Sequence, residues 1–176
     1  MLQKILGFVV LPLGVLTLVG YYVLGGFNPV EIEVVQTDPR IVIGQAYQGT
    51  YGDLALRKIF VEARRRQESG AVPGVLTVIN RDATSGSEEA VNQFIGITLS
   101  APIDSLPPEY QRDTLAAGIY LRARVAAHPL VQPRPRTINE QLADYAAEHQ
   151  LSVSGLPIEF YRASDTLWVE MAEVHR

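Results

Sequence analysis

The chain has 176 residues, of which 47% are hydrophobic and 19% charged, which is enough material for one well-buried core. Its net charge of −4 argues against a nucleic-acid partner, because such proteins need a cationic surface for the phosphates. The absence of cysteine excludes disulfides and thiolate metal sites, and the histidines His128, His149 and His175 lack zinc-ligand spacing. The sequence therefore predicts neither a metal nor a cofactor.

The N-terminal stretch 5–24 contains no charged residue over about 20 positions, which matches the thickness of a bilayer crossed by a helix. It predicts a single-pass transmembrane anchor, with residues 1–28 as anchor and linker and the lipid bilayer as a partner. A cleaved signal peptide is the alternative. Because Lys4 precedes the stretch and Glu31 and Glu33 follow it, the positive-inside rule predicts a domain on the non-cytoplasmic side.

The first half of the remaining chain alternates strand and helix patterns. In chain order we expect strands over Val30–Val35 and Arg40–Gln48, a helix over Tyr51–Gln67, and strands over Gly74–Ile79 and Gln93–Ser100. The helix follows from apolar residues at helical spacing, namely Leu56, Ile59, Phe60 and Ala63. A polar loop over Arg81–Ser87 separates the last two strands.

The second half repeats that order. We expect a strand over Thr114–Ala127, a helix over Thr137–His149 and a final hairpin of Pro157–Tyr161 with Thr166–Glu173. Thr137 and Glu140 have the spacing of a capping box at the start of the helix.

Two strand-helix-strand-strand units predict an α+β fold with pseudo-symmetric repeats. Helices would cover one face of antiparallel sheets, and a groove would lie where the repeats meet. Residues 29–176 would form this one domain.

Three short motifs resemble the GyrI-like family, whose members resemble the effector-binding part of multidrug-sensing transcription regulators. The motifs are Tyr47–Gly52, Ala117–Tyr120 and Pro157–Tyr161. With its N-terminal stretch the chain is most similar to the branch typified by the testis-expressed receptor for autophagy of the endoplasmic reticulum. It lacks that receptor's acidic tail and the regulators' helix-turn-helix, so neither the autophagy role nor DNA binding is implied.

The last hairpin carries the candidate binding residues. A turn centred on Ala163 and Ser164 would place Tyr161 opposite Thr166 and Glu159 opposite Trp168. Glu159, Tyr161, Trp168 and Glu170 would then share one face, and Ile158, Phe160, Leu167, Val169 and Met171 would pack under the helices.

A carboxylate flanked by aromatic rings suits a flat, apolar or cationic molecule. The resemblance implies that Glu159, in an E-x-Y motif, faces the ligand; otherwise it would be a surface residue paired with Arg122 or Arg124. Strand alternation adds Tyr120 and Phe94 to the candidate lining. For Tyr161 and Trp168, ordinary cross-strand packing is the alternative.

The first hypothesis is thus a non-catalytic module that binds a small hydrophobic or cationic ligand in the groove between the repeats. The second is a protein-protein docking module at a membrane. A third, implied by hydrolases of strained rings within the resembling family, makes Glu159 a general acid or base. No catalytic residue is assigned, because the motifs of common hydrolases, nucleotide-binding proteins and zinc proteases are absent.

Overall fold

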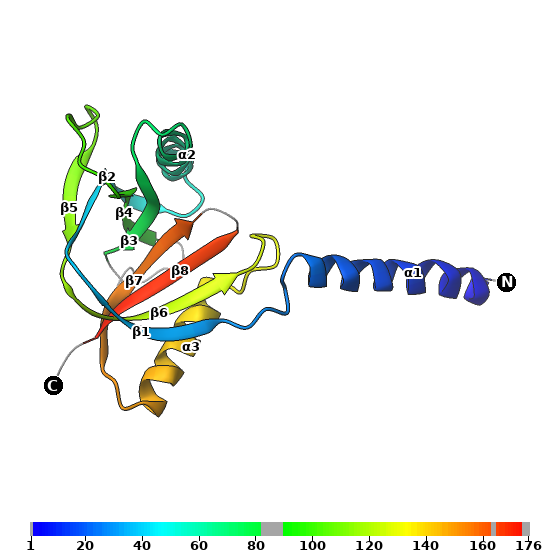
Figure 1. Cartoon of the computed structure of the whole chain (residues 1–176). Helices are drawn as coiled ribbons and strands as arrows, with labels where there is room; N and C mark the ends of the chain where they lie inside the picture. Colours follow the sequence, from blue (N-terminus) through cyan, green and yellow to red (C-terminus); the bar gives the residue numbers. More distant parts are fainter. Residues whose placement is uncertain (1, 82–89, 163–164, 174–176) are drawn as a thin grey trace.

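A computed structural model describes residues 2–81, 90–162 and 165–173, with side chains from Pro12 to Ala172 in these ranges. The predicted loop over Arg81–Ser87 lies, beyond Arg81, outside the described residues. The chain begins with α1 (Leu2–Val23), which extends away from the rest of the molecule (Figure 1). The segment that follows α1 is attached to the rest of the domain by Asn28, whose side-chain amide donates a hydrogen bond to the backbone oxygen of Ala126 at 2.6 Å.

The predicted transmembrane anchor is not supported by the structure. Within the described residues, no helix combines the length and the apolar character needed to cross a membrane. The predictions of a single-pass membrane protein and of a domain on the non-cytoplasmic side are therefore wrong. They rested on the absence of charged residues between Ile5 and Leu24.

The rest of the chain confirms the α+β class, although the described strands form one antiparallel sheet instead of several. The strands are β1 (Glu31–Thr37), β2 (Arg40–Thr50), β3 (Gly74–Asn80), β4 (Ala90–Leu99), β5 (Gln111–Leu115), β6 (Gly118–Ala126), β7 (Val153–Arg162) and β8 (Thr166–Glu173). Their spatial order is β1-β6-β8-β7-β3-β4-β2-β5. The helices that follow β2 and β6 are α2 (Leu54–Glu68) and α3 (Pro135–Glu148).

The two units β2-α2-β3-β4 and β6-α3-β7-β8 lie symmetrically about the pairing of β7 with β3. Moving outward, β8 matches β4 and β6 matches β2, while β1 and β5 form the edges. At the centre, Val78 on β3 lies opposite Glu159 on β7. The middle of the sheet is thus where the two units meet.

Both helices pack on the same face of this sheet. Under α2, Ala63 packs with Leu76, Val78 and Ile95, and partly buried Tyr161 joins the cluster. Under α3, the cluster contains Leu121, Ala123, Val125, Ile138, Leu142, Ala146, Leu167 and Val169, and Tyr161 packs against it as well. Tyr161 therefore lies between the two helix-covered cores.

The opposite face of the sheet curls on itself and encloses a separate core. Val42, Phe94, Leu115, Tyr120, Ile158 and Phe160 are buried there together, with Val35 from the edge strand β1 packed against them. Arg40 on β2 reaches Glu170 on β8 at 2.7 Å, although three strands separate these two in the sheet. Only a strongly curved sheet brings such strands together.

Two predicted boundaries are wrong. The single strand expected over Thr114–Ala127 is divided, because β5 pairs with β2 whereas β6 pairs with β1 and β8. The expected capping box at Thr137 is absent: α3 begins earlier, with Arg134 as N-cap and Pro135 in the first turn, and no side chain caps it. Glu140 instead accepts a hydrogen bond from Arg136 at 2.8 Å.

The register of the last hairpin also differs from the prediction by one residue. Tyr161 lies opposite Leu167, Phe160 opposite Trp168 and Glu159 opposite Val169. Since side chains alternate along a strand, this shift moves Trp168 and Glu170 to the face opposite Glu159 and Tyr161.

Candidate functional site

Three adjoining hollows open on the helix-covered face, between α2 and the segment that leads into α3. The first, of about 400 Å³, is lined by Tyr51, Leu56, Arg57, Phe60, Val78, Gln93, Ile95, Pro135, Glu159 and Tyr161. The second, of about 300 Å³, is lined by Pro129, Gln132, Pro133, Arg134, Pro135, Ile138, Asn139, Glu159, Tyr161, Leu167 and Val169. The third, of about 260 Å³, adds Arg64 and Asp165 around Tyr161. Because Tyr161 borders all three, we treat them as one groove.

Glu159 lies on the floor of this groove, and its carboxylate borders both the first and the second hollow. The Tyr161 hydroxyl donates to its Oε2 at 2.5 Å, and the side-chain amide of Asn80, which donates to the backbone oxygen of Pro157 at 2.8 Å, also favours the ionised form. Burial raises the pKa of Glu159, and Tyr161 and Asn80 oppose the increase. The carboxylate is thus partly desolvated and is held by neutral donors.

Tyr161 is positioned by an aromatic contact as well as by Glu159. Its ring meets Phe60 of α2 edge to face, with centroids 5.2 Å apart. Burial, followed by the nearby charge of Glu159, raises the pKa of its hydroxyl well above the ordinary value. At neutral pH this hydroxyl therefore remains a proton donor toward Glu159.

The alternative in which Glu159 pairs with an arginine of β6 is wrong. Arg122 pairs with Glu170 at 2.8 Å and with Glu33 at 3.3 Å, and Arg124 pairs with Glu31 at 3.0 Å. Both arginines project from the other face of the sheet. Among the described residues, Glu159 forms no ion pair.

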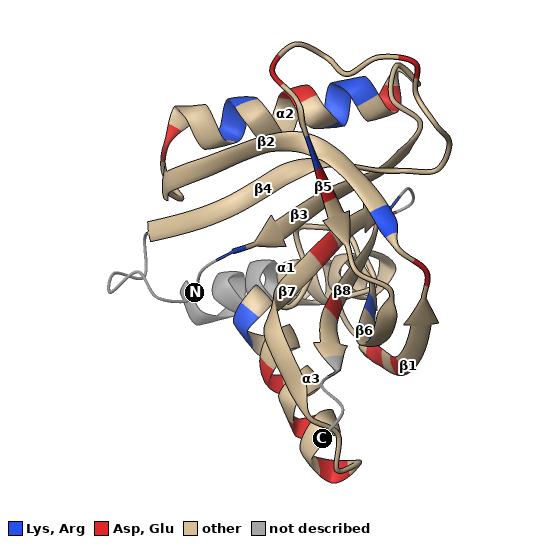
Figure 2. Cartoon of the chain, turned by 90° about the vertical axis from the view of Figure 1, so that its left-hand side faces the viewer, with Lys and Arg blue, Asp and Glu red and all other residues tan. Residues whose placement is uncertain are grey.

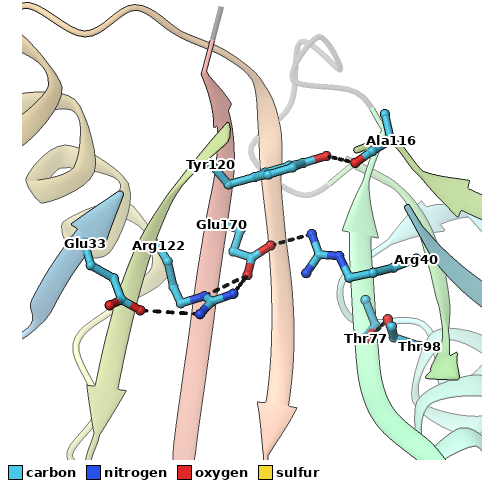
Figure 3. A network of polar contacts seen from close by, with 8 residues as sticks. All are labelled: Glu33, Arg40, Thr77, Thr98, Ala116, Tyr120, Arg122 and Glu170. Atoms are coloured by element: carbon cyan, nitrogen blue, oxygen red, sulfur yellow. Dashed lines mark hydrogen bonds and ion pairs between the residues drawn. The ribbon is translucent and has the colours of Figure 1, made fainter. Parts of the chain in front are cut away.

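Two other predicted lining residues, Tyr120 and Phe94, belong to the enclosed face, and Figure 3 shows Tyr120 there near Glu170 and Arg40. The hydroxyl of Tyr120 donates to the backbone oxygen of Ala116 at 2.8 Å, and Phe94 is 1% exposed within the same core. Neither residue borders the groove. The prediction that they line it together with Glu159 is contradicted by their position, because the curved sheet buries that face.

Trp168 also lies away from the groove. The guanidinium of Arg122 lies 4.2 Å from its ring centroid, and that of Arg162 lies 3.6 Å away. Trp168 borders a separate hollow of about 360 Å³ with Glu31, Glu33 and Arg124. Glu31, Glu33 and Arg124 already pair with one another or with Arg122, and Arg162, which also borders this hollow, stacks on the Trp168 ring.

Sequence reasoning missed several residues of the groove. Tyr51, Phe60 and Pro135 form its walls, and Gln93 orients Asn80 by donating to its side-chain oxygen at 2.9 Å. Phe60 was identified only as part of the apolar stripe of its helix. Asn80 and Gln93 carried a signal, because polar side chains interrupt two otherwise apolar strands.

The arrangement of potential metal ligands among the described residues does not indicate a metal centre. In that part of the chain, no group of three histidine, cysteine, aspartate or glutamate residues could hold a metal ion. The geometry instead provides a carboxylate, a phenol and aromatic walls around a groove open to solvent.

Comparison with known proteins shows the fold. No protein-family model and no curated protein matches the chain. Among solved structures, the C-terminal domain of EcmrR aligns with 84% of this chain and 99% of its own, at 9% identity and a TM-score of 0.58. SAV2435 bound to tetraphenylphosphonium aligns over 82% and 94%, at 16% identity and a TM-score of 0.52. An integron cassette protein of Vibrio cholerae aligns over 81% and 95%, at 11% identity and a TM-score of 0.52.

The chain shares the fold of these three solved structures, which fits a GyrI-like fold. This confirms the resemblance at the level of the fold, and identities this low show no more than that. The narrower prediction of the membrane-anchored receptor branch finds no support in the structure or among these neighbours.

Proposed function

We propose that the GyrI-like domain, residues 29–176, binds a small hydrophobic or cationic molecule in the groove. Glu159 supplies the counter-charge, and the rings of Tyr161, Phe60 and Tyr51 supply apolar contact. The observation that carries this proposal is a partly desolvated carboxylate whose hydrogen bonds come from neutral groups.

A carboxylate without a cationic partner, such as that of Glu159, is costly to bury. Taking a carboxylate out of water costs free energy unless a cation or hydrogen-bond donors compensate it. Tyr161 and Asn80 compensate part of that cost, and burial still raises the pKa. A bound cation would provide the rest, while the aromatic walls would attract it through cation-π contact and dispersion.

A neighbour with the same fold supports this choice of ligand class. SAV2435 was solved with tetraphenylphosphonium, a bulky lipophilic cation. At 16% identity its ligand does not transfer directly to this chain, yet it provides a suitable first probe.

The test measures tetraphenylphosphonium binding to the intact chain by titration calorimetry, with the wild type and Glu159→Gln compared. Gln keeps the shape and an acceptor for Tyr161 but removes the charge, so we expect affinity to fall about tenfold. Glu148→Gln is the matched control, because Glu148 is exposed at the end of α3 and borders none of the three hollows. It should bind as the wild type does.

Equal affinity of Glu159→Gln and the wild type would refute the counter-charge role. Absence of binding by the wild type, with the chain shown to be folded by its circular dichroism, would refute this ligand class.

A further inference from the structure

Two arginines border the two hollows that contain Glu159. Arg57 lies on α2 and borders the first hollow, and Arg134 immediately precedes α3 and borders the second. Pro135 borders both hollows, so the two arginines flank the same part of the groove. Figure 2 shows basic positions on α2 and at the start of α3.

These two guanidinium groups differ from the other arginines of α2. Arg65 and Arg66 pair with Glu62 at 3.0 and 2.9 Å. Arg57 and Arg134 form neither an ion pair nor a side-chain hydrogen bond among the described residues, and both are exposed. Their donors are available to a ligand.

Their positions are also unfavourable for helix stability. Arg57 lies in the first turns of α2, and Arg134 is the N-cap of α3. The partial positive charge of a helix N-terminus repels a cation, so a neutral residue would stabilise either helix slightly better. Helix formation therefore does not account for these two arginines.

We propose that the preferred ligand is amphoteric: an aromatic compound with a cationic group for Glu159 and an anionic group for Arg57 and Arg134. This inference rests on the proposed function, because it assumes that a ligand occupies the groove. The floor carries one negative charge and the walls carry positive charge, so such a ligand would match both. A simple lipophilic cation would satisfy the floor and be repelled by the walls.

The test uses a matched pair of fluorescent probes, a rhodamine with a free benzoic acid group and the methyl ester of the same dye. The acid is a zwitterion and the ester is a cation of nearly the same shape. Binding to the intact chain is followed by fluorescence anisotropy at low ionic strength. We expect the acid to bind about fivefold more tightly than the ester, as befits ion pairs at an exposed site.

The double variant Arg57→Gln/Arg134→Gln should lose this preference while it retains affinity for the ester. Lys58→Gln is the charge control, because Lys58 is next to Arg57 on the exposed side of α2 and borders none of the hollows. It should preserve the preference. Added salt should reduce the preference of the wild type, since exposed charges are screened.

The outcomes separate this inference from the proposed function. Equal binding of both dyes by the wild type would overturn the amphoteric preference and leave the cation-binding groove intact. A preference that survives in the double variant would overturn the role of the two arginines. Failure of both dyes to bind would overturn the preference together with the proposed function.

Discussion

Two glutamates on neighbouring strands show how the two faces of one sheet differ. Glu159 on β7 lies on the helix-covered face and is held by neutral donors. Glu170 on β8 lies on the enclosed face, with a side chain that is 0% exposed, and receives Arg40 at 2.7 Å and Arg122 at 2.8 Å. One carboxylate lacks a cation, and the other has two.

The difference assigns distinct roles to similar side chains. Arg40 comes from the first repeat unit, whereas Arg122 and Glu170 come from the second, so the buried network joins the two units across the curved sheet (Figure 3). Because the charges of this network satisfy one another, the network itself has little to offer a ligand. The groove retains unmatched charge, as a binding site requires.

The strongest test of this comparison is Glu170→Gln. The substitution leaves Arg40 and Arg122 largely buried without their shared counter-charge, so we expect the free energy of unfolding to fall by about 3 kcal/mol. Urea denaturation of the intact chain measures the change. The exposed end of the same network supplies the control: Glu33 is 58% exposed, and Glu33→Gln should cost at most about 1 kcal/mol.

If the two variants lose the same stability, the buried network contributes no more than a surface ion pair. The two glutamates would then differ in their position in the sheet but not in how strongly their pairing stabilises the fold.

The sequence was sufficient to predict the α+β class and the order of the elements. Apolar periodicity identified both helices of the domain, and alternation identified the strands. The divided strand was missed because residues 114–127 are compatible with one continuous strand. Only the pairing of β5 with β2 separates them, and that contact is distant in sequence.

The candidate site was predicted in part, and the turn of the last hairpin explains the rest. Alternation alone placed Glu159 and Tyr161 on one face of β7. Whether Trp168 joins them depends on the register, and Arg162 pairs with Thr166 across a three-residue connection. Its last residue, Asp165, has a φ of 56°, the left-handed conformation typical of such connections. A shift by one residue then exchanged the faces of β8.

Trp168→Phe tests that exchange with a smaller effect. The indole lies between Arg122 and Arg162, and its Nε1 is buried without a hydrogen-bond partner among the described residues. Phenylalanine keeps an aromatic face for both cations and removes an unsatisfied donor, so we expect a loss of stability of about 1 kcal/mol or less. Affinity for tetraphenylphosphonium should not change.

Urea denaturation and the calorimetric titration check both parts. A large drop in affinity would place Trp168 in the binding site and contradict the observed register.

The smallest expected effect is a pH-dependent change of stability in Glu159→Gln. Folding raises the pKa of Glu159, so the folded chain binds a proton more tightly than the unfolded chain does. The stability that this group contributes is full below its ordinary value of 4.5 and is lost as the pH rises through the folded pKa. Without a ligand, Glu159→Gln should therefore melt at a higher temperature than the wild type at neutral pH. The two melting temperatures should converge as the pH approaches that ordinary value.

Glu170→Gln should show the opposite order at neutral pH, melting below the wild type, because its carboxylate is already paired. A wild type that is more stable than Glu159→Gln at neutral pH would mean that Tyr161 and Asn80 fully compensate the carboxylate, leaving no cost for a cationic ligand to relieve.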